Sequence, residues 1–121
     1  STRLATKIYK KYEAESLTIV QNTPYRLVQD IHGIGFKTAD KIAQALGLAH
    51  DDPGRIEAGI AYTLNRAADD GHVYVPQDEL EPKAAEILDL KPEQVTQVIN
   101  QLETDDLVKR ETLTYHFPAD E

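Results

Sequence analysis

The sequence predicts a mainly α-helical protein of two small units, the second of which also contains short strands. Three observations favour this class. Apolar residues recur at helical spacing along most of the 121 residues. Clusters of glycine, proline and aspartate divide these stretches into short helices. Two β-prone runs follow one another near the C-terminus, as in a β-hairpin.

Four helices are expected in the first half. In the first of them Leu4, Ile8 and Tyr12 recur at steps of four and share one face. Ser16 is a candidate N-cap for the second helix, and Gly47 is a candidate stop for the fourth. The expected ranges are 2–12, 16–22, 24–31 and 36–46.

The second half has three further helical patterns, at 53–69, 77–88 and 92–105. A β-prone run covers 72–75, and a β-hairpin is expected at 107–110 and 113–117. The order helix, strand, helix, helix, strand, strand is typical of a winged-helix unit. The sequence therefore predicts one domain over residues 1–50 and a winged-helix-like domain over residues 51–121.

Charge is distributed unevenly between these halves. The net charge of −8 argues against a nucleic-acid partner for the chain as a whole. However, residues 1–50 hold seven Lys/Arg and four Asp/Glu, a net charge of +3, whereas residues 51–121 carry −11. Contact with a polyanion is therefore expected in the first half, and packing or partner docking in the acidic second half.

The segment 27–46, LVQDIHGIGFKTADKIAQAL, carries the most specific pattern. Gly33 and Gly35 permit a tight turn, Ile34 can fill the space between two helices, and Ala39 lets those helices approach closely. Ile31, Ile42 and Leu46 are expected to complete the small core. The turn leaves the first amides of the next helix facing outward at the positive end of its dipole. This is a helix-hairpin-helix pattern, and it predicts a DNA-phosphate site formed by Gly33, Ile34, Gly35, Lys37, Thr38 and Lys41. The alternative is a helical turn whose glycines serve only helix capping.

Residues 2–12 repeat the pattern of residues 36–46 at an offset of 34. The expected unit is therefore a tandem helix-hairpin-helix unit whose first copy is truncated at its turn. Further DNA contacts are expected from basic residues on and near the first helix, although a solvated helix face explains them equally well. These candidates are Arg3, Lys7, Lys10, Lys11 and Arg26.

Several function classes lack supporting residues. Cysteine is absent, which excludes disulfides and thiolate metal sites, and the four histidines have no metal-ligand spacing. No nucleophile–base constellation stands out, so we expect no catalytic residue, no metal site and no cofactor. No apolar run reaches the roughly 20 residues of a membrane helix, and we expect a cytoplasmic protein without a membrane partner.

The stretch from Asn22 to Gly47, with TPYRL and IHGIGFKTADKIAQALG, resembles the N-terminal region of long-form RecD-like DNA helicases. These belong to the family of the exodeoxyribonuclease V alpha subunit. Arg55–Ala68 followed by GHVYVP matches as well, and the resemblance extends to the helix pair and the hairpin that ends at Phe117. The resemblance implies an ATP-dependent 5′→3′ DNA helicase in repair and recombination.

In that family the ATPase motifs follow this region, so ATP and magnesium are expected for the parent protein only. The resemblance implies that these residues are a non-enzymatic accessory region, with single-stranded or forked DNA and the parent's motor domains as partners. It also points to the six hairpin residues as the DNA contacts. An interaction scaffold, docking on the motor domains or on another protein, stays open as the alternative.

Overall fold

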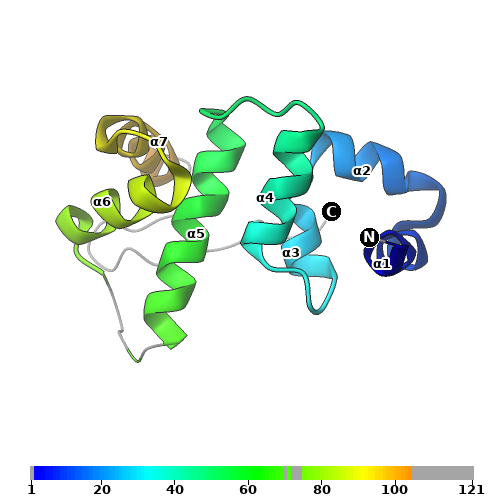
Figure 1. The fold of residues 1–121 in the computed structure, drawn as a ribbon. Helices are drawn as coiled ribbons and strands as arrows, with labels where there is room; N and C mark the ends of the chain where they lie inside the picture. The colour runs from blue at the N-terminus through cyan, green and yellow to red at the C-terminus, as the bar shows by residue number, and fades with distance from the viewer. Residues whose placement is uncertain (1, 70, 72–74, 105–121) are drawn as a thin grey trace. The chain divides into compact units, whose positions relative to one another are not determined.

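The computed structural model of the chain describes residues 2–69, 71 and 75–104, and this part is helical with no strand (Figure 1). The chain divides into two compact units, residues 1–50 and residues 51–121. The mainly α-helical class is confirmed. The predicted β-hairpin at 107–117 and residues 72–74 of the predicted strand lie outside the described residues, so the winged-helix prediction stays a prediction.

The first unit consists of short helices that end where the sequence patterns end. Two of the predicted ranges, 2–12 and 16–22, agree with the structure. The elements are α1 (Thr2–Tyr12), the 3₁₀ turn η1 (Glu13–Glu15), α2 (Ser16–Asn22), α3 (Arg26–Asp30) and α4 (Phe36–Ala45). At the end of α4, Gly47 adopts a φ of +99°, and the amide of Leu48 donates to the carbonyl of Ala43 at 3.0 Å. Gly47 therefore ends the helix as predicted.

Two local predictions were wrong. The helix expected from residue 24 begins at Arg26, because the amides of Arg26, Leu27 and Val28 donate to carbonyls only three residues back, which makes a tighter turn than an α-helix. Ser16 does not cap α2. Its hydroxyl instead donates to the carbonyl of Glu13 at 2.7 Å and lies inside the first turn.

The core of the first unit is small and draws on all of its helices. Leu46 was expected in this core, but 51% of its surface is exposed. It follows the last residue of α4 and turns away from the partners that bury Ile31 and, in part, Ile42. The buried cluster comprises Ile8, Tyr12, Ile19, Leu27, Ile31, Ile34 and Ala39.

The second unit packs three helices against one another: α5 (Pro53–Asp69), α6 (Gln77–Leu88) and α7 (Pro92–Thr104). Asp52 caps α5, because its carboxylate accepts the amide of Gly54 at 2.9 Å. The apolar faces of α5, α6 and α7 form the core that the periodicity predicts, although Ala67, Ile87 and Val98 are only half-buried. Its largest fully buried side chains are Ile60, Leu80, Leu88, Val95 and Ile99.

Close approach of α5 and α6 depends on Gly59. A Cβ at this position would lie 2.6 Å from Cδ2 of Leu88, so only glycine fits without a shift in its neighbours. The side chain of Arg55 is also buried, and its Nη1 donates to the carbonyl of Leu88 at 2.8 Å. This bond gives a partner to a carbonyl in the last turn of α6, which would otherwise lack one.

Candidate nucleic-acid interface

The turn between α3 and α4 is a tight hairpin built from Ile31 to Gly35. The amide of Ile34 donates to the carbonyl of Ile31 at 3.2 Å, which closes the turn. Gly33 has a φ of +95°, a conformation that L-residues with a side chain rarely adopt. Ile34 is almost completely buried in the core of the unit, so its side chain anchors the turn and only its backbone can face a ligand.

Gly35 is the N-cap of α4, and no side chain in the described part of the chain caps this helix. The first helical hydrogen bond of α4 runs from the amide of Ala39 to the carbonyl of Gly35, at 3.1 Å. The amides of Lys37 and Thr38 precede it and have no acceptor one turn back in the helix. Together with the helix dipole, such amides form a site that favours an anion.

Gly35 itself is in an extended conformation, with φ −96° and ψ 178°. A Cβ added there would meet nothing within 4 Å. Neither backbone conformation nor packing therefore requires glycine at this position. Glycine is itself a common N-cap, and the absence of a side chain at this position also leaves room for a ligand to approach the backbone closely.

Lys37 and Lys41 extend the positive field along α4. Both side chains are exposed, and their spacing of four places them on the same face of the helix. Thr38 is half-buried beside them. The structure thus brings five of the six predicted hairpin residues to the surface in whole or in part, with Ile34 as the buried exception.

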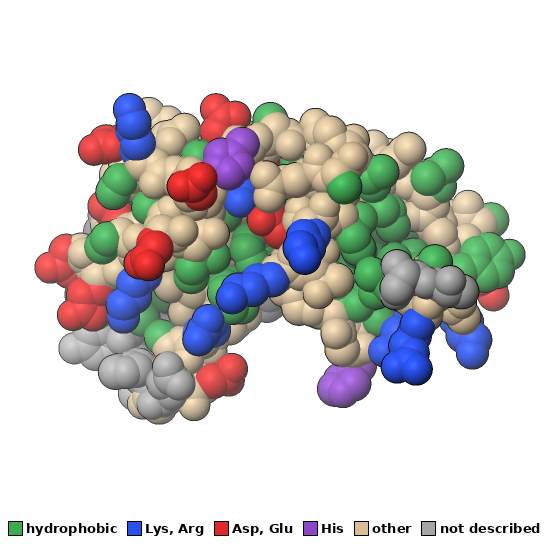
Figure 2. Space-filling view, in the orientation of Figure 1, with side chains coloured by type: hydrophobic (Ala, Val, Ile, Leu, Met, Phe, Trp, Pro, Cys, Tyr) green, Lys and Arg blue, Asp and Glu red, His purple; other side chains and the backbone are tan. Residues whose placement is uncertain are grey.

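Among the further candidates, the cations of α1 differ in what surrounds them. Arg3, Lys7, Lys10 and Lys11 are all exposed, and Lys and Arg side chains gather over α1 in Figure 2. The ammonium of Lys7 reaches the hairpin turn, because its Nζ would lie 3.3 Å from a Cβ built on Gly33. Arg26 is held elsewhere, by Asp30 and Tyr12.

A network of three side chains joins α1 to α3. The hydroxyl of Tyr12 donates to Oδ2 of Asp30 at 2.8 Å, and Nε of Arg26 donates to the same oxygen at 2.8 Å. The guanidinium of Arg26 also lies over the ring of Tyr12, at 5.6 Å from its centroid. The network ties α1 to the helix that leads into the hairpin.

These contacts shift two pKa values in opposite directions. Burial, and then the hydrogen bond to Asp30 and its charge, raise the pKa of Tyr12 well above its usual value. For Asp30, burial raises the pKa, but hydrogen bonds from Tyr12 and Arg26 and the charges of Arg26 and Lys11 outweigh it and leave the pKa below its usual value. The carboxylate of Asp30 is therefore ionised at neutral pH.

A second network, which the sequence did not suggest, links α4 to Tyr25 at the start of α3. The buried carboxylate of Asp40 accepts hydrogen bonds from the hydroxyl of Tyr25 at 2.5 Å and from Nε2 of Gln44 at 3.0 Å. The rings of Tyr25 and Phe36 stack with their centroids 5.8 Å apart. The spacing of four between Asp40 and Gln44 is compatible with a hydrogen bond along one helix face, so the sequence contained a signal for that contact. The bond from Tyr25 joins two separate helices and depends on how they pack.

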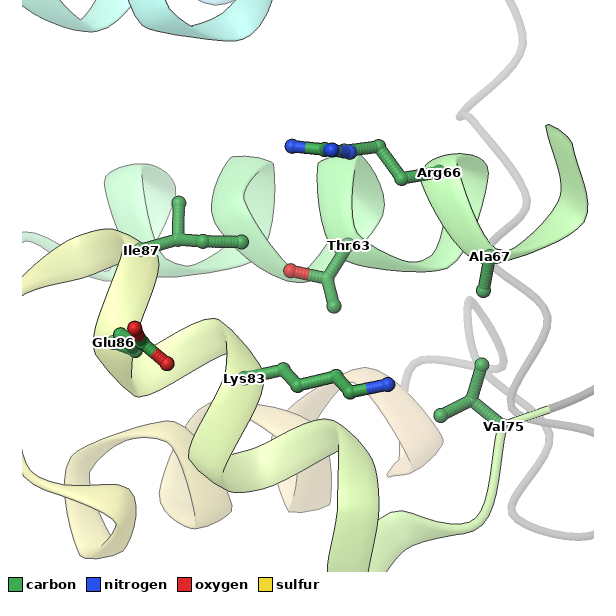
Figure 3. A pocket seen from close by; sticks show the side chains of 7 residues that line it. All are labelled: Thr63, Arg66, Ala67, Val75, Lys83, Glu86 and Ile87. Carbon is green, nitrogen blue, oxygen red and sulfur yellow. The ribbon is translucent and has the colours of Figure 1, made fainter. Parts of the chain in front are cut away.

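The second unit contains a pocket of about 320 Å³ lined by α5, α6 and Val75 (Figure 3). Two of its polar groups are already engaged on α5: the hydroxyl of Thr63 donates to the carbonyl of Gly59 at 2.8 Å, and Nη1 of Arg66 donates to the hydroxyl of Tyr62 at 3.0 Å. The charged side chains of its lining are two cations, Arg66 and Lys83, and one carboxylate, Glu86.

Two further features bear on function. In the described ranges, no three His, Asp or Glu side chains lie close enough together to hold a metal ion. No helix among the described residues has both the length and the apolar character that crossing a membrane requires.

Comparison with known proteins agrees with the hairpin geometry. Residues 1–74 match the family described as the ATP-dependent RecD2 DNA helicase HHH domain. The ATP-dependent RecD2 DNA helicase of Deinococcus radiodurans is 37% identical to this chain over 78 residues, which are 64% of this chain and 11% of the relative. The chain therefore corresponds to a small part of the length of that curated relative.

Proposed function

Because this chain belongs to the family of ATP-dependent RecD2 DNA helicase HHH domains, we propose that residues 1–50 bind the DNA backbone without reading its sequence. The observation that carries the proposal is the hairpin before α4. Its N-cap is a glycine that neither conformation nor packing requires, and it exposes the helix N-terminus next to Lys37 and Lys41. The proposed phosphate ligands are the backbone of Gly33, Ile34 and Gly35 together with Lys37, Thr38 and Lys41.

The proposed context is an accessory region of an ATP-dependent 5′→3′ DNA helicase of the exodeoxyribonuclease V alpha type, in DNA repair and recombination. The partner would be single-stranded or forked DNA. We assign no catalytic step, ATP site or metal site to these residues. Binding by one hairpin is expected to be weak, because it offers few phosphate contacts and the acidic second half repels the same polyanion.

Fluorescence anisotropy with labelled single-stranded, duplex and forked DNA, at low and moderate salt, tests the proposal. The variant Lys37→Glu/Lys41→Glu reverses the charge beside the hairpin and is expected to abolish binding. The matched control Lys83→Glu/Lys91→Glu changes the net charge equally on exposed residues of the second unit. Salt-sensitive binding that only the first variant loses would support the proposal. Equal losses in both variants would show that binding depends on net charge and not on a hairpin site. A folded protein that binds no DNA at low salt would overturn the proposal.

The net charge of −11 in residues 51–121 favours a second candidate, an interaction scaffold that docks on the motor domains or on another protein. On this reading the hairpin is purely structural. Titration with the separately produced motor domains distinguishes the two, since a scaffold must bind them and a phosphate binder need not. An absence of any binding to them would count against the scaffold.

We also keep the proposal that residues 51–121 form a winged-helix-like unit. The order of α5, α6 and α7 supports it. Backbone chemical shifts from NMR, measured over residues 72–75 and 107–117, would reveal or refute the strands that the proposal needs.

A further inference from the structure

The ammonium of Lys7 lies against the backbone of the hairpin turn. Lys7 belongs to α1, yet its Nζ would be 3.3 Å from a Cβ built on Gly33, which is 26 residues further along the chain. Gly33 precedes the N-cap Gly35 by two residues, so the two Cα atoms are within about 7.6 Å of each other. The tertiary fold thus brings a lysine from another helix to the edge of the proposed phosphate site.

Three other cations near α1, Arg26, Lys11 and Lys10, are placed differently. Arg26 forms an ion pair with Asp30 at 2.8 Å, and the charge of Lys11 also acts on Asp30. Their positive charges are therefore partly compensated. Lys10 is exposed and lies about 60° around the helix from Lys7, further from the buried face that carries Ile8.

Lys7 itself has no such compensation. Within the described residues Lys7 forms no hydrogen bond or ion pair, whereas the carboxylates of Asp30 and Asp40 are bonded to other side chains. The ammonium sits next to a turn that leads into the positive end of the α4 dipole. Two positive features that converge without an anion between them repel one another, and a phosphate placed there would be attracted by both.

We propose that Lys7 and the hairpin turn hold the same DNA phosphate, so that α1 completes the site. This inference rests on the proposed function and adds a ligand from outside the hairpin. It also distinguishes two cations of α1: Lys7 makes a direct contact, whereas Lys10 acts only through the general positive field. The fixed position of α1, which the Tyr12–Asp30 hydrogen bond secures, then becomes a condition of phosphate binding.

A double-mutant cycle on the whole chain tests this sharing. Lys7→Gln and the matched control Lys10→Gln each remove one exposed charge from α1. Each is combined with Gly35→Ser, whose hydroxyl would compete for the amides at the start of α4. Binding is measured by anisotropy with single-stranded and forked DNA over a range of salt concentrations.

We expect Lys7→Gln to weaken binding by about fivefold at low salt and to lower the slope of log K against log salt by about 0.7–0.9, the value for one lost phosphate contact. Lys10→Gln is expected to weaken binding by about twofold or less. The effects of Lys7→Gln and Gly35→Ser should be non-additive, because the two changes damage one contact, whereas Lys10→Gln and Gly35→Ser should add.

The remaining outcomes separate this inference from the proposed function. Equal and additive effects of Lys7→Gln and Lys10→Gln, in a chain that does bind DNA, would overturn the role of Lys7 and leave the hairpin site standing. A large but additive effect of Lys7→Gln would place Lys7 on a different phosphate and also overturn the sharing. A folded wild-type chain that binds no DNA at low salt would overturn both proposals.

Discussion

At the residue scale, the two glycines of the hairpin meet different demands. Gly33 is required by its φ of +95°, which would strain a residue with a side chain by about 1–2 kcal/mol. Gly35 is extended and has open space around it. A fold would tolerate many residues at position 35, including serine, which is among the best N-caps. Stability and the proposed phosphate binding would therefore make opposite demands at this position.

Gly35→Ser is expected to stabilise the protein by a few tenths of a kcal/mol, because the hydroxyl can accept an amide of the first turn of α4. The same change should weaken DNA binding severalfold, since the hydroxyl occupies the amides that a phosphate needs. Urea denaturation and anisotropy measure the two effects. A variant that lost stability and binding together would show instead that Gly35 serves only the fold.

Asp30 makes the stability of the first unit sensitive to acid. Its folded-state pKa lies below the unfolded value, so the carboxylate contributes stability above the unfolded pKa, near 4, and this contribution is lost as pH falls through the folded pKa. Asp30→Asn should be less stable than wild type at pH 7, and the difference should shrink as pH falls below about 4. Urea denaturation between pH 7 and pH 3, with the exposed Asp51→Asn as control, checks this. A constant difference across the range would contradict it.

At the element scale, short helices depend on close contact with their neighbours. The five-residue α3 is too short to be stable alone, and its Leu27 is completely buried among the other helices of the first unit.

The predicted internal repeat gains only partial support from burial. Arg3 and Lys37 are both exposed, as are Lys7 and Lys41, but Ala5 is exposed where Ala39 is fully buried. The repeat therefore stays a prediction.

The contact between α5 and α6 allows a sharper prediction. Gly59→Ala would gain about 1 kcal/mol in helix propensity, but its Cβ would lie 2.6 Å from the fully buried Leu88, and overpacking costs about 1–3 kcal/mol. We expect net destabilisation. In a Leu88→Ala background the clash is absent, so Gly59→Ala should then stabilise. Thermal or urea unfolding of the four proteins measures the coupling, and purely additive effects would argue against close contact.

At the scale of the whole molecule, the acidic second half is expected to weaken the proposed DNA binding. The net charges of +3 and −11 act on the same polyanion with opposite sign. Exposed glutamates of α6 and α7 would contribute to this repulsion, and several Asp and Glu side chains lie on the surface over these helices in Figure 2.

Replacing Glu79, Glu86 and Glu93 by glutamine is expected to raise DNA affinity a few-fold at low salt. The gain should vanish near 1 M salt, where the Debye length falls to about 3 Å. Anisotropy titrations of both proteins at several salt concentrations measure it. A gain that persisted at high salt would point to a direct contact in place of a long-range field.

Features that depend on local order could be predicted from the amino-acid sequence alone. Apolar periodicity placed α1, α2, α5 and α6 at the bounds that the structure has, and glycine spacing located the hairpin. A helix, its stop and a tight turn each follow from residues within a few positions of one another, so a linear pattern contains the necessary information. The family resemblance rests on the same local segments.

Contacts between side chains that are distant in the sequence could not be predicted and follow from the packing of the helices. Tyr12 and Asp30 are 18 residues apart, Tyr25 and Asp40 are 15 apart, and Arg55 reaches a carbonyl 33 residues away. The sequence offered Lys7 as one of several equivalent cations, and the fold alone placed it beside Gly33. Such contacts depend on how helices pack, and helix packing is set by the shapes of buried surfaces from separate segments, which no local pattern encodes.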